Sequence, residues 1–307
     1  MYWDTSEKTP SKKAWDKWAS LLIAHFPRLF FFANMAFNMN RYQDWLFVAP
    51  WADKRYRRTL DLGCGKGLFL RMLLKRSDMV VGLDGSEYEL GFAKKLLIKA
   101  LGGGKLHLVR ASASQLPFKD GAFDLVWSNC VIEHIEEDGK VFAEGRRCLT
   151  GNGEFIVTLP NSDGAPSLVK RLIFRFRKGI GRLLASRDLR QYLEFTDIND
   201  AEEWLNINRW QQVRRGYTED ELDRTARRLG LRVDKVRYYL SGKVLEFWDL
   251  ATFSRLNDVF PLNFFLLSPV MHLLNFIERG TRKNAAVIGV KFAVDGESPA
   301  EPPTKAG

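Results

Sequence analysis

The sequence predicts an α/β fold built on a doubly wound, mostly parallel sheet, and two neighbouring stretches lead to that prediction. The first is an apolar strand over 59–62, which runs through the turn Gly63-Cys64-Gly65-Lys66-Gly67 into a predicted helix over 68–75. The second is an apolar strand over 79–83, followed at once by Asp84. Glycines let the backbone turn tightly and approach a ligand, and an acid at the end of the second strand can accept hydrogen bonds from a ribose. Together they predict a nucleotide-cofactor site at the carboxyl edge of the sheet.

The remaining elements follow in the order that such a sheet requires. Further strands are predicted over 105–110, 123–128, 154–159, 232–240 and 286–294. Helices are predicted over 87–100, 138–149 and 219–229, with glycine-rich turns at 102–104 and 151–153. Thr218 is a predicted N-cap, because Glu221 follows three residues later and completes a capping box.

Two more motifs make the prediction specific. These are Leu116-Pro117-Phe118 and the run Phe123-Asp124-Leu125-Val126-Trp127-Ser128-Asn129, which continues two residues later as Val131-Ile132-Glu133-His134-Ile135. With these motifs in this order, the chain resembles the class I S-adenosylmethionine-dependent methyltransferases, strongly over 59–160 and weakly over 216–294. Nicotinamide-dependent oxidoreductases also place an acid after the second strand, but neither motif has a role in them.

The resemblance implies a Rossmann-like, seven-stranded sheet whose last strand is antiparallel, and S-adenosylmethionine as the cofactor. Asp61 and the glycines would hold its methionyl end, Asp84 its ribose, and Ser112 and Ala113 would border the adenine. Ser112 stands where the family usually has an aspartate, so a weaker adenine contact is expected. By matching position, the implied cofactor residues are Asp61, Gly63, Cys64, Gly65, Gly67, Asp84, Gly85, Ser86, Ser112, Ala113 and Asn129. No metal is implied.

His134 is the candidate general base, because it follows the fourth strand at the pocket edge and imidazole titrates near neutral pH. The alternative is that His134 only lines the pocket or bonds a backbone carbonyl. Glu133 is either the first residue of a helix or an acid of the cofactor pocket.

The expected organisation is a helical N-terminal cap (1–58), a cofactor-binding core (59–160), an insertion (161–215), the rest of the core (216–294) and a disordered tail (295–307). A second insertion, 241–284, lies inside the last part of the core. Both insertions follow parallel strands and therefore leave from the carboxyl edge, where ligands bind. We expect both to cover the methyl-acceptor side.

The first insertion carries most of the net charge of +10, since residues 168–190 hold eight basic residues and one acid. Apolar residues at spacing four, Leu168, Leu172 and Phe176 among them, run beside Arg171 and Arg175. This pattern predicts an amphipathic helix at an anionic membrane surface, or a lid helix that packs on the core. The apolar segment 259–277 contains prolines and polar residues, which disfavour a spanning helix and favour a surface-docked pair.

These observations predict a methyltransferase for a hydrophobic, membrane-associated or lipid-linked acceptor, methylated on oxygen or, as second choice, on carbon. The alternatives are a soluble small metabolite, RNA, or a fold that binds without catalysis. RNA is disfavoured, because the basic stretch is interleaved with aliphatic residues rather than stacking aromatics. Three scattered cysteines and the N-terminal sequence predict a reducing, cytoplasmic location, peripheral to the inner face of a membrane. No spacing in the chain encodes an oligomeric state.

Overall fold

The computed structural model describes residues 26, 43–179, 183, 191–208, 212–213, 216–253, 269–271, 273–274 and 280–295. Most of the predicted N-terminal cap, most of segment 259–277 and the predicted tail beyond 295 lie outside the described residues.

The core is one seven-stranded sheet in the order β3-β2-β1-β4-β5-β7-β6. Its strands are β1 Tyr56–Leu62, β2 Ser77–Asp84, β3 Leu106–Arg110, β4 Phe123–Asn129, β5 Leu149–Pro160, β6 Leu231–Ser241 and β7 Ala285–Val294. Strands β1 to β5 pair in parallel, and β7 runs antiparallel to both β5 and β6. The sequence-based prediction of a mostly parallel sheet with an antiparallel last strand is confirmed.

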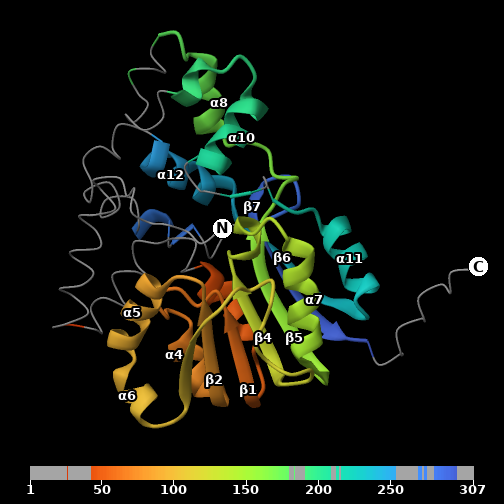
Figure 1. Cartoon of the computed structure of the whole chain (residues 1–307). Coiled ribbons are helices and arrows are strands. Elements are labelled where there is room, and N and C mark those ends of the chain that lie inside the picture. Colours follow the sequence, from red (N-terminus) through yellow and green to blue (C-terminus); the bar gives the residue numbers. More distant parts are fainter. Residues whose placement is uncertain are drawn as a thin grey trace, which may run out of the picture.

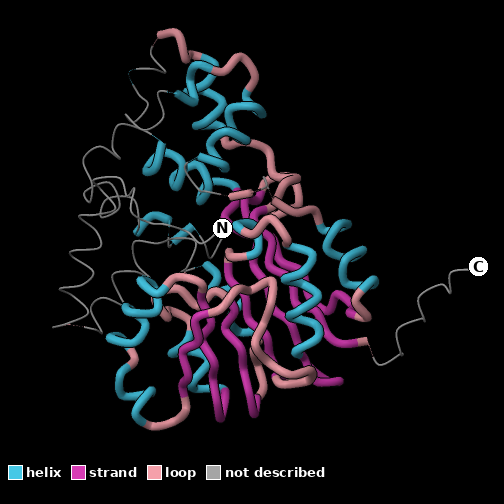
Figure 2. The backbone as a smooth tube through the Cα atoms, viewed as in Figure 1, coloured by secondary structure: helices cyan, strands magenta, loops and turns pink. Residues whose placement is uncertain are grey.

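Helices cover both faces of the sheet (Figure 1). On one face pack α4 Leu70–Arg76 and α5 Glu87–Leu96, together with the short turns η1 Asp44–Val48 and η2 Ala49–Trp51. On the other face pack α7 Asp138–Cys148 and α11 Glu219–Arg228. The short η3 Ile132–His134 follows β4, and α6 Ile98–Gly102 precedes β3. The tube view shows the strands side by side between these helical layers (Figure 2).

Local signals set several of these boundaries. Thr218 Oγ1 accepts from the Glu221 amide, and the Glu221 carboxylate accepts from the Thr218 amide, so the predicted capping box is present. Two predictions were wrong in detail. The helix expected over 87–100 breaks at Leu97, where α5 gives way to α6. The turn expected at 151–153 belongs to β5, which begins at Leu149 and pairs irregularly there with β4.

Both insertions begin at the carboxyl edge, as predicted. The first follows β5 and contains α8 Leu168–Arg175, η5 Gln191–Glu194 and α10 Ile198–Asn208, and the second follows β6 and begins with α12 Gly242–Phe253. Helices α8, α10 and α12 gather beyond one end of the sheet (Figure 1). Within the described part of the chain, no helix combines the length and the apolar character needed to cross a bilayer.

A buried polar cluster joins α8 to α12. The Glu246 carboxylate accepts from the amides of Leu168 and Val169 at 2.6 and 2.8 Å, so α12 caps the start of α8. Asp249, one turn further along α12, is fully buried and hydrogen-bonded to Ser167. From the other side, Lys170 Nζ lies 2.7 Å from Glu202 of α10, whose second oxygen accepts from Tyr192. The cluster holds three carboxylates and one ammonium group, so it carries an excess of negative charge.

Asp249→Asn is expected to remove a pH dependence from the stability of this insertion. Burial, and after it the charges of Glu202 and Glu246, raise the pKa of Asp249 to about 6, although Lys170 and Ser167 act in the opposite direction. A carboxyl whose pKa is raised by folding stabilises the folded state below its unfolded pKa and loses that contribution as pH rises through its folded pKa. The wild-type contacts should therefore weaken between about pH 4 and pH 6, by up to about 3 kcal/mol.

Hydrogen exchange of the α8 and α12 amides, corrected for intrinsic rates, measures this effect between pH 4 and 7.5. The Asn variant should show constant protection across that range. Asp200→Asn, an exposed acid on α10, is the matched control and should behave as wild type. Equal pH dependence in wild type and Asp249→Asn would contradict the expectation.

Candidate active site at the carboxyl edge

The glycine turn after β1 has the backbone conformation that its glycines were expected to supply. Gly63, Gly65 and Gly67 have φ of 76°, 49° and 80°, a region that favours glycine. The amides of Gly63 and Cys64 both donate to the Leu83 carbonyl, at 2.7 and 2.9 Å. These bonds fasten the turn to the end of the neighbouring strand β2.

Asp84, at the end of β2, connects the same turn to the next loop. Its Oδ2 accepts from the Gly65 amide at 2.9 Å, and its Oδ1 accepts from the Ser86 amide at 2.8 Å. Ser86 in turn caps α5 through Glu89. An ionised carboxylate offers about four acceptor positions, so Asp84 can accept two further hydrogen bonds from a ligand while it keeps both of these.

The backbone on either side of Asp84 is open at two glycines. A Cβ placed on Gly65 would meet no atom within 4 Å, and one placed on Gly85 would meet only the Ala111 carbonyl, at 3.9 Å. Bare backbone beside a partly exposed carboxylate is the donor and acceptor set that an adenosine ribose requires. The residues present therefore fit S-adenosylmethionine, the cofactor of the resembling family.

Side chains close the other side of the glycine turn. A Cβ on Gly63 would lie 2.3 Å from Cγ2 of Val131, so the loop after β4 packs directly on the turn. Asp61 and Asn129 are buried at the ends of β1 and β4. Burial, then the charge of Asp61, raises the pKa of the Cys64 thiol well above its ordinary value, so this thiol stays protonated.

The predicted adenine-bordering residues follow β3. Ser112 is exposed and its hydroxyl lies 2.9 Å from that of Ser114, while Ala113 is buried. Their contact with adenine stays a prediction.

His134 and Glu133 lie together in η3. The His134 Nε2 atom is 3.8 Å from Glu133 Oε1, and the His134 side chain is 30% exposed whereas Glu133 is buried. The Glu133 carbonyl accepts from the Val213 amide at 2.8 Å, so the end of the first insertion contacts this turn. A partly exposed imidazole beside a buried carboxylate can take up a proton, and its role as base stays a prediction.

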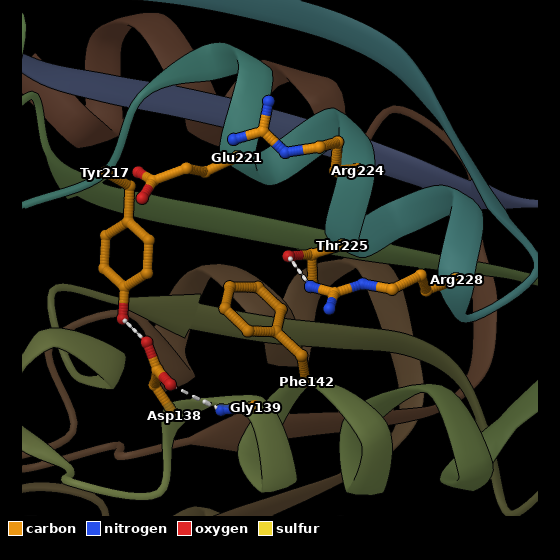
Figure 3. A pocket seen from close by; sticks show the side chains of 8 residues that line it. All are labelled: Asp138, Gly139, Phe142, Tyr217, Glu221, Arg224, Thr225 and Arg228. Carbon is orange, nitrogen blue, oxygen red and sulfur yellow. Dashed lines mark hydrogen bonds between the residues drawn. The ribbon is translucent and has the colours of Figure 1, made fainter.

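A separate pocket of about 280 Å³ lies between α7 and α11 (Figure 3). Tyr217 donates to Asp138 at 2.9 Å across one end of it, and Arg228 donates to Thr225 at 3.2 Å at the other. None of the predicted cofactor residues lines this pocket.

Comparison with known proteins agrees with the geometry. A family described as a methyltransferase domain matches residues 60–157, which run from β1 through β5 and include the glycine turn, Asp84 and the loop after β4. Residues 60–157 therefore form a methyltransferase domain of the class I S-adenosylmethionine-dependent kind. The match covers nearly all of the predicted cofactor-binding core, 59–160.

Named methyltransferases are among the relatives. A malonyl-[acyl-carrier protein] O-methyltransferase of Legionella pneumophila is 40% identical over 121 residues, which is 39% of each chain. An uncharacterized protein of Methanocaldococcus jannaschii is 30% identical over 177 residues, or 58% of this chain and 71% of the relative. The chain thus spans about two fifths of the length of the Legionella methyltransferase.

The fold is shared with the geranyl diphosphate C-methyltransferase of Streptomyces coelicolor A3(2), at a TM-score of 0.53 and 13% identity. That comparison covers 83% of this chain and 76% of the other.

Sequence reasoning named Asn129, at the end of β4, but missed three buried polar residues at the same edge of the sheet. Thr158 lies near the end of β5, Tyr239 lies near the end of β6, and Asp44 belongs to η1. Thr158 and Tyr239 could have been found by comparing the ends of the predicted parallel strands. No sequence signal links Asp44 to them.

Proposed function

We propose that this protein transfers the methyl group of S-adenosylmethionine to an oxygen, or to a ring carbon, of an apolar acceptor held at an anionic membrane surface. In this proposal the glycine turn and Asp61 hold the methionyl end, Asp84 the ribose, and Ser112 and Ala113 border the adenine. The cofactor supplies an electrophilic methyl group. The protein contributes a dry, oriented site, and His134 is the candidate acceptor of the substrate's proton.

The observation that carries the membrane part of the proposal is the exposed face of α8. Leu168, Leu172 and Phe176 lie on successive turns and are 51%, 45% and 52% exposed. Arg171 and Arg175 are also exposed on this helix. The opposite side, Ile173 and Phe174, is buried against η5 and α10.

An apolar stripe flanked by arginines favours the headgroup region of an anionic bilayer. There the leucines and the phenylalanine leave water, and each basic residue near the surface contributes about 1 kcal/mol. A lid that packed its apolar stripe on the core, the alternative interpretation, would bury Leu168, Leu172 and Phe176 instead. Because α8 follows β5 at the carboxyl edge, a membrane bound to it would lie on the acceptor side.

Flotation with liposomes tests the proposal. The wild-type protein should float with anionic vesicles of phosphatidylglycerol and phosphatidylcholine, less so at high salt, and weakly with phosphatidylcholine alone. Arg171→Glu/Arg175→Glu should lower the partition coefficient at least about 30-fold. Arg227→Glu/Arg228→Glu on α11 makes the same charge change away from α8 and is the matched control.

A second assay tests whether the methyl acceptor is apolar, separately from whether the protein binds membranes. Methyl-labelled S-adenosylmethionine is incubated with the protein and a membrane extract, and label is counted in the organic phase. Label in that phase supports an apolar acceptor. Absence of flotation together with label only in the aqueous phase would favour a soluble metabolite under a lid.

A further inference from the structure

A chain of buried hydrogen bonds runs from the N-terminal turn η1 to the end of β4. Asp44 is fully buried and accepts from the hydroxyl of Tyr239, which is itself hydrogen-bonded to Thr158. Thr158 Oγ1 then receives the Asn129 side-chain amide at 2.6 Å and lies 3.6 Å from the Cys130 thiol. Groups from η1, β6, β5 and β4 are thus connected inside the protein.

The donor directions along this chain are consistent. Burial, and next the charge of Asp44, raise the pKa of Tyr239 well above its ordinary value, so its hydroxyl stays protonated and donates. Asn129 Nδ2 can only donate, so Thr158 Oγ1 accepts from it and has its own proton left for Tyr239. These bonds join buried groups, and in such a low-dielectric environment each hydrogen bond is stronger than it would be in water.

Unusual backbone conformations flank this network on both sides. Within the described segments, Cys130 and Leu240 are the two residues other than glycine with positive φ, at 49° and 55°. The Leu240 amide donates to the buried Gln43 Oε1 at 2.6 Å, immediately before η1. Turn η1 is itself π-helical, a rare form that is frequent at functional sites. Such conformations persist only where the surroundings enforce them.

The strained residue Cys130 lies at the cofactor site. Its neighbour Val131 packs on Gly63, and its own amide donates to the Thr158 carbonyl at 3.0 Å. The turn formed by Asn129 and Cys130 therefore lies between the glycine turn and β5. A displacement of Thr158 would move this turn relative to the cofactor.

We propose that Asp44, Tyr239 and Thr158 are positioning residues for methyl transfer, which hold the Asn129–Cys130 turn against the reacting end of the bound cofactor. The N-terminal turn η1 thereby completes the active site from a position before the first strand of the sheet. The inference rests on the cofactor part of the proposed function and is independent of the acceptor and of the membrane.

Alkylation of the cysteines by iodoacetamide, followed by peptide mass spectrometry, tests this inference without a substrate. Cys130 is partly exposed, whereas Cys64 and Cys148 are buried and report any global opening. In the wild type, S-adenosylhomocysteine should slow the alkylation of Cys130 about tenfold. Tyr239→Phe should speed it about fivefold to tenfold without ligand, the effect of one lost buried hydrogen bond, and should reduce the protection by S-adenosylhomocysteine.

The neighbouring tyrosine provides a matched control. Tyr238 also donates to a carboxylate, that of Glu219 at 2.6 Å, but it packs on the other face of the sheet. Tyr238→Phe should leave the Cys130 rate unchanged. Thr158→Val, which removes the hydroxyl while keeping the branched shape, should repeat the effect of Tyr239→Phe.

Two results would overturn the inference. One is an unchanged Cys130 rate in Tyr239→Phe and Thr158→Val, and the other is an equal acceleration at all three cysteines, which would mean a purely structural role. Calorimetry with S-adenosylhomocysteine is run in parallel. A wild-type protein that fails to bind it contradicts the proposed function, whereas binding without protection of Cys130 contradicts only the positioning role.

Discussion

Replacing Asp84 with alanine should weaken the binding of S-adenosylmethionine by about 100-fold to 10,000-fold. The carboxylate accepts from the amides of Gly65 and Ser86, at 2.9 and 2.8 Å, and has acceptor capacity left for two ribose hydroxyls. A hydrogen bond to a charged group contributes about 1.5–3 kcal/mol, so the loss of two ribose bonds accounts for this range. Calorimetric titration with S-adenosylmethionine and S-adenosylhomocysteine measures the effect.

Two further variants separate the ribose contact from the fold of the turn. Asp84→Asn keeps one acceptor oxygen and should retain part of the affinity. Glu87 lies three residues after Asp84 and is an exposed acid that pairs with Arg110. Glu87→Ala should leave the affinity within about twofold of wild type. If Asp84→Ala bound S-adenosylmethionine as tightly as Glu87→Ala does, the assignment of Asp84 to the ribose would be wrong.

The cofactor-binding core and the start of α11 were predictable because their signals are local. The glycine turn, Asp84 and the capping box at Thr218 each depend on residues close in the sequence. The strand order then follows from the family resemblance and from the rule that parallel strands need crossover connections. Ser112 is exposed. The sequence alone does not show what its side chain contacts.

The face of α8 was not predictable in the same way. Spacing of four predicted an amphipathic helix whose apolar stripe either packs on the core or meets lipid. In the structure α8 ends at Arg175, and Phe176 to Gly179 form a turn. The helix buries Ile173 and Phe174 because Tyr192 lies beside them, with the Phe174 and Tyr192 rings 5.8 Å apart. Periodicity shows that a helix has two faces, but its partner decides which face is covered.

The positioning network was invisible for a related reason. Asp44 and Tyr239 are 195 residues apart, and neither lies in a recognisable motif. Strand β7 lies between β5 and β6 and runs antiparallel to both, so the end of β6 reaches the same edge of the sheet as the end of β5. There Tyr239 of β6 meets Asp44 of η1. Polar residues at the ends of predicted strands can indicate such a site. Asp44, which completes the network from η1, has no such signal in the sequence.

Replacing Glu154 with leucine should lower the free energy of unfolding by about 3–5 kcal/mol, the cost of leaving a buried charge without its partner. Glu154 lies in the middle of β5 and contacts Lys291 at 3.1 Å, Lys54 at 2.8 Å and the Tyr56 hydroxyl at 2.7 Å. Lys291 is only 4% exposed, and its other carboxylate, on Asp53, is exposed and 3.9 Å away. Lys291 thus depends on Glu154.

The double variant Glu154→Leu/Lys291→Met shows whether the stability is lost because Lys291 is left unpaired or because the packing changes. It removes both charges and keeps apolar volume, so its stability should be far closer to that of wild type than the stability of Glu154→Leu is.

The contribution of Glu154 also depends on pH. Although burial acts to raise the pKa of Glu154, hydrogen bonds from Lys54, Tyr56 and Lys291 hold it below its ordinary value of 4.5. The stability that this carboxylate contributes is therefore present above about pH 4.5 and is lost as pH falls through its lowered pKa. Urea unfolding of the three proteins at pH 7 and pH 3.5 measures both effects. If the double variant were as unstable as Glu154→Leu, the cost would arise from packing at β5 and not from the charge of Lys291.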